Sequence, residues 1–173
     1  MALPIDGIMK VTIVDSIVTH KDKMTQTQAY VTMANKPVFI AHCLVLAESI
    51  RDVGDNRDIV LFLFDSQQDS DKFIESYSPT IQRLRIDVRR VENPVSLDSV
   101  SPRYRHFARK YHFDYVKLLA FSLTEYDRVI FMDGDMILNG NIDDLFSLIP
   151  PHASDTWIAA ADGPYSPLNS GLV

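Results

Sequence analysis

The sequence predicts an α/β fold in which a doubly wound, mostly parallel mixed sheet is flanked by helices. Two largely apolar runs, IVLFLF at 59–64 and RVIFM at 128–132, are typical of parallel strands that are buried on both faces. Segments with helical spacing of apolar residues separate such strands, and this alternation is typical of α/β proteins. The chain has 173 residues, about the size of one domain, and shows no internal repeat.

The first part of the chain divides into an N-terminal extension and the start of this domain. Residues 1–28 are assigned to the extension, with an edge strand predicted at 11–18, and residues 29–173 to the domain. AYVTM at 29–33 is rich in β-branched and aromatic residues and predicts the first strand. VFIAHCLVLAESIRDVG at 38–54 predicts a helix, because apolar residues recur three or four apart before a C-capping glycine: Phe39, Cys43, Leu46, Ile50, Val53 and Gly54.

The second part is predicted to continue the alternation to the last residue. LRIDVRRV at 84–91 alternates apolar and polar residues, as a half-buried strand does. A long helix is expected over 104–126. NIDDLFSL at 141–148 predicts a short helix in which Asn141 is the N-cap and Asp143 a first-turn acid, both with structural roles. The other expected elements are a helix at 69–82, a loop at 93–102, and strands at 59–64, 128–132, 157–162 and 168–173.

Charge and targeting patterns argue against several classes of function. The net charge is −6, from 17 Lys and Arg against 23 Asp and Glu, whereas nucleic-acid binding depends on clustered positive charge. A basic and aromatic stretch at 103–111 is explained by an amphipathic helix with a basic face. Asp6, Lys10 and Asp15 interrupt the N-terminal region, so it resembles neither a signal peptide nor a membrane anchor. We therefore expect a cytoplasmic protein that binds neither nucleic acid nor a membrane.

Asp133-Gly134-Asp135 directly follows a predicted buried strand. In open α/β sheets, ligands bind outside the carboxyl ends of the strands. Two carboxylates one residue apart can face one hard cation, and oxygen ligands suit magnesium, manganese or calcium. Such a cation would neutralise a diphosphate and make it a better leaving group. The alternative is a solvated turn, since Asp-Gly pairs are common in turns.

Other motifs that contain paired aspartates fit less well. A calcium loop of the EF-hand type fails, because its fifth and sixth positions would be Ile137 and Leu138. No glycine-rich phosphate loop of the dinucleotide-binding or P-loop type occurs. VIFMDGDMI also resembles the first motif of haloacid-dehalogenase-type phosphatases. That motif opens its domain, however, and only 38 residues follow Asp135 here.

The residues around this motif carry a more specific resemblance. YVKLLAFSLTEYDRVIFMDGDMILNGNIDDLF is similar to the central signature of the glycogenin-like and galactinol-synthase-like glycosyltransferases of family 8. AYVTMANKPVFIAHCLVLAESIRDVG resembles the first strand and helix of that family, and AAADGPYSPLNSGLV resembles its Asn-Ser-Gly segment. The resemblance covers 29–173 and implies a GT-A fold with a Rossmann-like sheet. It also implies metal-dependent, retaining transfer of a hexose from UDP-glucose or UDP-galactose to a glycan, polyol or protein acceptor.

The resemblance also assigns expected roles to individual residues. Asp133 and Asp135 would hold manganese, or else magnesium, and Gly134 would lie near the ribose. Lys117 would approach the donor, and Asp162 and Asn169 would lie near the sugar hydroxyls as candidate catalytic residues. The residues expected to border the uracil and ribose are Ala29, Thr32, Met33 and Asn35. Several of these also have a structural interpretation; Lys117, for instance, could be an ordinary surface lysine whose stem lies on apolar groups.

The sequence departs from the family in its length. It stops at Val173, inside an apolar strand-like pattern, so we expect a domain whose C-terminal part is missing and whose open edge favours a homo-oligomer. A later His-x-x-Gly-x-x-Lys-type segment, which supplies the third metal ligand in the family, is not present. The alternative function is therefore a catalytically impaired module that binds a nucleotide sugar.

Overall fold

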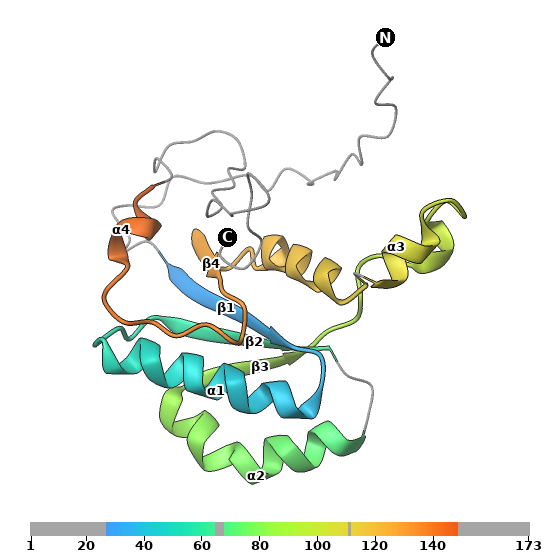
Figure 1. Ribbon diagram of the computed structural model, residues 1–173. Helices are drawn as coiled ribbons and strands as arrows, with labels where there is room; N and C mark the ends of the chain where they lie inside the picture. The colour runs from blue at the N-terminus through green and yellow to red at the C-terminus, as the bar shows by residue number, and fades with distance from the viewer. Residues whose placement is uncertain (1–26, 65–67, 111, 149–173) are drawn as a thin grey trace.

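A parallel sheet of four strands lies at the centre of the fold (Figure 1). The computed structural model describes residues 27–64, 68–110 and 112–148. The strands lie in the order β3-β2-β1-β4, and all neighbouring strands are parallel. Their bounds are Gln28–Ala34 for β1, Asp58–Leu63 for β2, Ile86–Arg90 for β3 and Arg128–Phe131 for β4.

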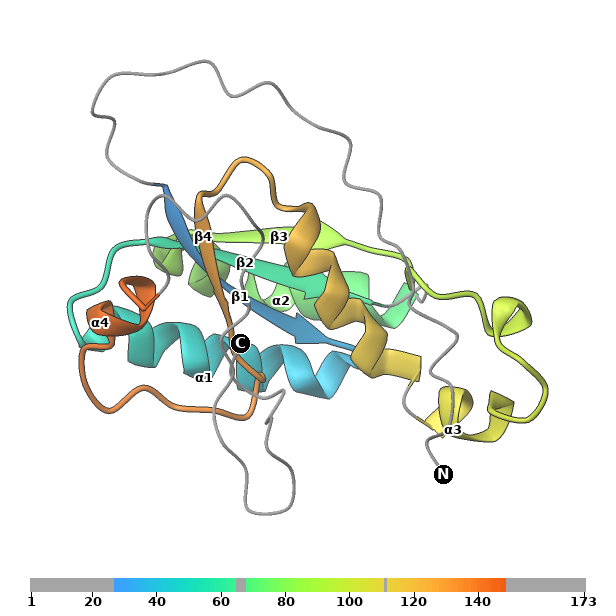
Figure 2. The same ribbon diagram turned by 90° about the horizontal axis from the view of Figure 1, so that it is seen from above.

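Helical segments cover both faces of the sheet and make three layers. Helices α1, Pro37–Asp52, and α2, Gln68–Leu84, pack on one face. The 3-10 helix η2, His112–Ser122, lies across the other face (Figure 2). Side chains of β1 alternate between the two cores, with Tyr30 on the α1 side and Val31 on the η2 side. The predicted α/β fold with strands buried on both faces is thus confirmed.

Helix α1 begins and ends close to the predicted bounds. Pro37 opens it, at a position where the missing N–H costs no helical hydrogen bond. Gly54 ends it at φ +83°, and the N–H groups of Gly54 and Asp55 donate to the carbonyls of Arg51 and Ile50. This is the Schellman arrangement, in which a glycine adopts the left-handed conformation. Phe39 differs from the expectation of burial, since its side chain is exposed.

The boundary between α2 and β3 lies later than the sequence predicts. Leu84 was expected to open the strand, but it is the last residue of α2 and is buried in the core. Arg85 then adopts φ 53°, which ends the helix, and β3 starts at Ile86. The alternation of Leu84, Ile86 and Val88 crosses the boundary between the two elements. Leu84 is buried as the last residue of the helix, whereas Ile86 and Val88 belong to the strand, so the spacing of two indicated a strand that was too long.

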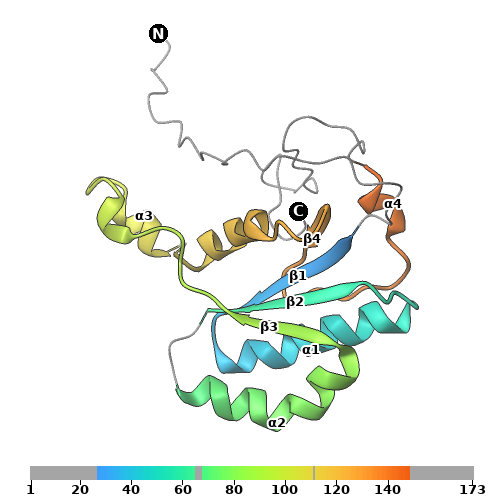
Figure 3. The same cartoon turned by 180° about the vertical axis from the view of Figure 1, so that it is seen from behind.

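The single long helix expected over 104–126 is wrong. The chain forms η1, Leu97–Ser99, then α3, Arg105–Lys110, and then η2 (Figure 3). One helix of that length would span about 34 Å, whereas strands of four to seven residues span about 23 Å at most. Only η2 packs on the sheet, through Val116 and Ala120; the buried side chain of α3 is Ala108.

The last described helix, α4, comprises Asp143–Phe146. Asn141 Oδ1 accepts a hydrogen bond from the Asp143 N–H at 2.7 Å, although Ile142 holds the N-cap position itself. The predicted strands at 157–162 and 168–173 lie outside the described residues, as does the extension up to residue 26. No helix in the described part of the chain is long and apolar enough to cross a membrane.

A cluster of charged side chains, of which Asp55 is buried, connects α4 to the amino edge of the sheet. Arg57 Nη1 lies 2.5 Å from a carboxylate oxygen of both Asp55 and Asp143, and its guanidinium lies 4.4 Å from the centre of the Phe146 ring. The side chain of Asp55 is only 3% exposed and also accepts a 2.8 Å hydrogen bond from the Tyr30 hydroxyl. Arg57 therefore joins β1, the β2 edge and α4 through one guanidinium.

Replacing Arg57 by Met should lower the free energy of unfolding by about 2 kcal/mol, because the buried Asp55 carboxylate loses its charged partner. Urea unfolding measures this change. The matched control is Arg83→Met, which removes an exposed ion pair with Glu48 and should have little effect. Equal losses in the two variants would contradict the role assigned to Arg57.

Candidate functional site

The strand order creates a switch point between β1 and β4. The chain leaves β1 toward β2 and β3 on one side, and returns to β4 on the other side of β1. In parallel sheets of this kind, the crevice at the carboxyl ends of the two strands is the usual ligand site. The segment after β1 contains Asn35, and the segment after β4 contains Asp133-Gly134-Asp135. The Met132 N–H donates to the Val31 carbonyl at 2.8 Å, so the two segments lie side by side.

Gly134 packs directly against α1 and the end of β1. A Cβ atom at this position would lie 2.6 Å from Cys43 Sγ, 3.4 Å from the Met33 carbonyl oxygen and 3.6 Å from Thr32 Oγ1. The Cys43 thiol donates to the Met33 carbonyl at 3.3 Å. Real contacts at 2.6 Å are not tolerated, so the motif requires glycine between its two aspartates as long as Cys43 occupies this position.

Cys43 is the buried apolar residue that the sequence predicts. Its side chain is 1% exposed. Burial, with smaller contributions from the Asp135 and Asp133 carboxylates, raises the pKa of the Cys43 thiol to about 11. The thiol is therefore protonated at neutral pH and packs as a small side chain beneath the two carboxylates.

Lys117 of η2 reaches the same edge of the sheet. Its Nζ lies 2.8 Å from Asp133 Oδ1 and 5.5 Å from the centre of the Phe131 ring. The Lys117 side chain is 16% exposed, while the Asp133 side chain is 36% exposed and open to a ligand. Lys117 and Asp133, which are 16 positions apart in the sequence, thus form one charged group.

Asp133 and Asp135 have the donor chemistry of a site for a hard divalent cation. Both are carboxylates, they flank Gly134, and both are at least partly exposed. Manganese and magnesium prefer such oxygen ligands. Within the described residues, no group of three or more His, Cys, Asp or Glu side chains could hold a metal. The two aspartates could therefore supply two oxygen ligands to a metal, and no third side chain of these types joins them in the described part of the chain.

The segment after Asp135 is held against α1. The Met136 N–H donates to the Asp133 carbonyl at 3.1 Å, which makes a tight turn around the motif. The Leu138 N–H donates to Ser49 Oγ of α1 at 2.9 Å, and Leu138 itself is buried in the core. Helix α1 thus supports this segment at Ser49 as well as at Cys43.

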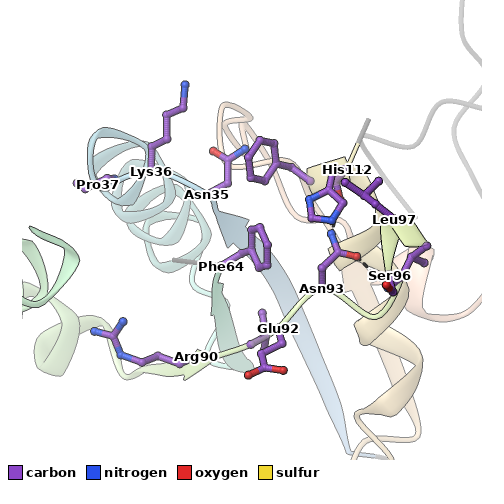
Figure 4. A pocket seen from close by; sticks show the side chains of 13 residues that line it. Asn35, Lys36, Pro37, Phe64, Arg90, Glu92, Asn93, Ser96, Leu97 and His112 are labelled. Atoms are coloured by element: carbon purple, nitrogen blue, oxygen red, sulfur yellow. Dashed lines mark hydrogen bonds between the residues drawn. The ribbon is translucent and has the colours of Figure 1, made fainter. Parts of the chain in front are cut away.

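An open pocket of about 960 Å³ lies at the carboxyl ends of β1, β2 and β3 (Figure 4). The side chains of Asn35, Phe64 and His112 border it, and the rings of Phe64 and His112 are 6.0 Å apart. Asn93 shapes its wall, because Asn93 Nδ2 donates to the His112 carbonyl and Oδ1 accepts from the Val95 N–H at 2.9 Å. Phe64, Asn93 and His112 were not predicted; Phe64 could have been, since it follows a strand.

The structure brings together most, but not all, of the predicted site residues. Met33 and Asn35 are half-buried at the carboxyl edge, and Thr32 is buried beneath Gly134. Ala29 is not at this edge: it is fully buried near the amino end of β1, where it pairs with Asp58 and Val129. Asp162 and Asn169 lie outside the described residues.

Comparison with known proteins identifies the family. The profile described as "Glycosyl transferase family 8" matches residues 15–160. The chain belongs to glycosyltransferase family 8. The resemblance seen in the sequence is thereby confirmed, and glycosyl transfer is favoured over the phosphatase alternative.

Individual relatives of this family 8 chain are much longer than the chain. It is 35% identical over 118 residues to inositol phosphorylceramide glucuronosyltransferase 1 from Arabidopsis thaliana, which covers 68% of this chain and 20% of that protein. Galactinol synthase 7 from the same plant is 26% identical over 133 residues, or 76% of this chain and 37% of that protein. The solved glycosyltransferase GlyE of Streptococcus pneumoniae TIGR4 matches with a TM-score of 0.46 and 19% identity, over 86% of this chain and 33% of that one.

The contact between Gly134 and Cys43 predicts a coupled pair of variants. Gly134→Ala in this family 8 chain should lower the free energy of unfolding by about 1–3 kcal/mol, because the added methyl group overlaps the Cys43 sulfur. Adding Cys43→Ala removes that sulfur and should restore part of the loss. Urea unfolding of the four proteins in this double-mutant cycle should give a coupling of at least about 0.5 kcal/mol. Strictly additive effects would mean that the sulfur does not set the glycine requirement.

Proposed function

We propose that this chain is the donor-binding part of a metal-dependent, retaining hexosyltransferase that uses a UDP-sugar. The main support is the grouping of Asp133, Asp135 and Lys117 at the switch point of the sheet. Family membership supports glycosyl transfer in general, and a nucleotide-sugar donor with it. The chain spans about a fifth of the length of the first relative, so the activity of the whole protein is also part of the proposal.

The proposed chemistry is electrostatic. Asp133 and Asp135 would hold manganese or magnesium, which supplies positive charge to the diphosphate of the departing UDP. Lys117 carries a further positive charge at this edge, because its ammonium lies beside Asp133. Charges placed in advance where negative charge develops contribute more to such a reaction than proton transfer does. Asp162 and Asn169 remain proposed contacts of the sugar.

The pocket at the carboxyl ends of β1, β2 and β3 is proposed to take the nucleoside. The Phe64 ring offers an apolar surface, and the Asn35 side chain offers a donor and an acceptor to the edge of a base. Ligand sites commonly combine an apolar lining with a few polar groups of this kind. The pocket and the two aspartates lie at the same carboxyl edge of the sheet, and the diphosphate is proposed to span the distance between them.

The donor site predicts a metal-dependent stabilisation by UDP. UDP with manganese at 100 times its dissociation constant should stabilise the chain by about 2.7 kcal/mol, which corresponds to several degrees in Tm. The Asp133→Asn/Asp135→Asn variant should lose this shift. The control Asp52→Asn/Asp144→Asn makes the same charge change with exposed residues away from the motif and should keep it. No shift at millimolar UDP with manganese or magnesium would refute the proposed donor site.

The pocket predicts a separate effect on nucleotide affinity. Asn35→Ala should weaken UDP binding about tenfold, equivalent to about 1.4 kcal/mol, because the base loses a hydrogen bond. Isothermal titration with UDP and manganese measures this loss. Asn56→Ala, an exposed asparagine near the end of α1, is the control and should bind UDP as the unchanged chain does. Equal affinity in both variants would place the nucleoside elsewhere.

Activity distinguishes an enzyme from a binding module. Release of UDP should be measured with UDP-glucose and UDP-galactose, and with UDP-glucuronate because one relative is named a glucuronosyltransferase. Turnover with either hexose donor supports the proposed reaction. Binding of UDP without turnover of any donor supports the alternative, a nucleotide-sugar-binding module without catalysis in this chain.

A further inference from the structure

Lys117 contacts one of the two aspartates that would hold a metal. Its ammonium lies 2.8 Å from Asp133 Oδ1, and the Phe131 ring lies on another side at 5.5 Å from Nζ. The side chain is 16% exposed, so the ammonium is held within the site and is not a freely mobile surface charge. The position next to Asp133 Oδ1 is therefore taken by a positive charge.

This positive charge has a physical effect on the two neighbouring carboxylates. Asp133 and Asp135 are separated only by Gly134, which packs against Cys43. Two like charges at short range repel each other, more strongly when partly shielded from water. The Lys117 ammonium offsets this repulsion. The same ammonium repels any divalent cation that approaches Asp133.

We propose that Lys117 is a resident counter-ion that the metal must displace from Asp133, and that it then moves to the donor diphosphate. This inference rests on the proposed function, because it assigns a regulatory step to the same site. The diphosphate then replaces the Asp133 carboxylate as the negatively charged partner of the ammonium. Metal alone should therefore bind weakly, and metal with nucleotide should bind cooperatively. Such coupling is reciprocal: each ligand raises the affinity of the other by the same factor.

The residue type fits an exchange between two partners. A lysine ammonium is a compact charge on a flexible stem, and it can turn from one anion to another. An arginine at this position would form two parallel hydrogen bonds with a carboxylate and would leave it less readily. Lys117→Met and Lys117→Arg therefore have opposite expected effects on binding of metal alone, which separates the exchange from a merely structural role.

The test measures Mn²⁺ binding without and with UDP, from the electron paramagnetic resonance signal of free Mn²⁺ after subtraction of the Mn²⁺ that UDP binds in protein-free solution. Without UDP, Lys117→Met should bind Mn²⁺ about tenfold more tightly than the unchanged chain, and Lys117→Arg more weakly. UDP should raise the Mn²⁺ affinity of the unchanged chain markedly and that of Lys117→Met much less. Lys72→Met, on α2, is the control for loss of a lysine and should behave as the unchanged chain does. Circular dichroism verifies that each variant is folded.

The possible results separate the two proposals. If the unchanged chain binds Mn²⁺ with UDP, but Lys117→Met binds Mn²⁺ alone no more tightly, the counter-ion role is overturned and the donor site stands. If neither protein binds Mn²⁺ with or without UDP, the donor site and the counter-ion role both fail. Tighter binding by Lys117→Met together with a reduced effect of UDP is the result expected from displacement.

Discussion

The parallel pairing of β1 with β4 is the constraint on which the rest of the site depends. It places the segment after β4 beside the end of β1, with Met132 hydrogen-bonded to Val31 at 2.8 Å. This contact brings Gly134 against Cys43. It also places the two aspartates at the switch point between β1 and β4. Because β1 also pairs with β2, the same strand joins the aspartates to the neighbouring pocket.

Two aspartate–cation pairs, one at the amino edge and one at the carboxyl edge of the sheet, differ in how deeply the aspartate is buried. Asp55 is 3% exposed, is bound by Arg57 and also accepts a hydrogen bond from Tyr30. Breaking such a pair leaves an uncompensated buried charge, so the Asp55–Arg57 ion pair stays formed and has a structural role. Asp133 is 36% exposed and contacts a single-point ammonium. The Asp133 carboxylate is partly exposed to solvent, so another cation can reach it and replace the Lys117 ammonium.

Local patterns allowed much of the fold to be predicted, and their failures have identifiable causes. The helix at 38–54 and the strand at 59–64 were predicted nearly to the residue, because a C-capping glycine and a continuous apolar run are local signals. The helix over 104–126 was wrong because only the part that forms η2 packs on the sheet, and packing against distant elements is not contained in a local pattern. The resemblance to family 8 placed Ala29 at the nucleotide, whereas the parallel register places it near the amino end of β1.

The sequence by itself determined which segments become strands and that two carboxylates follow one of them, because both properties depend on neighbouring residues. Its resemblance to family 8 also indicated the importance of Lys117. Only the tertiary structure decided that Lys117 contacts Asp133 and that Cys43 lies under Gly134. It also revealed the pocket formed by Asn35, Phe64 and His112, and the role of Arg57. These contacts join residues far apart in the chain, and they exist only because the strand order and the packing of helices on the sheet bring those residues together.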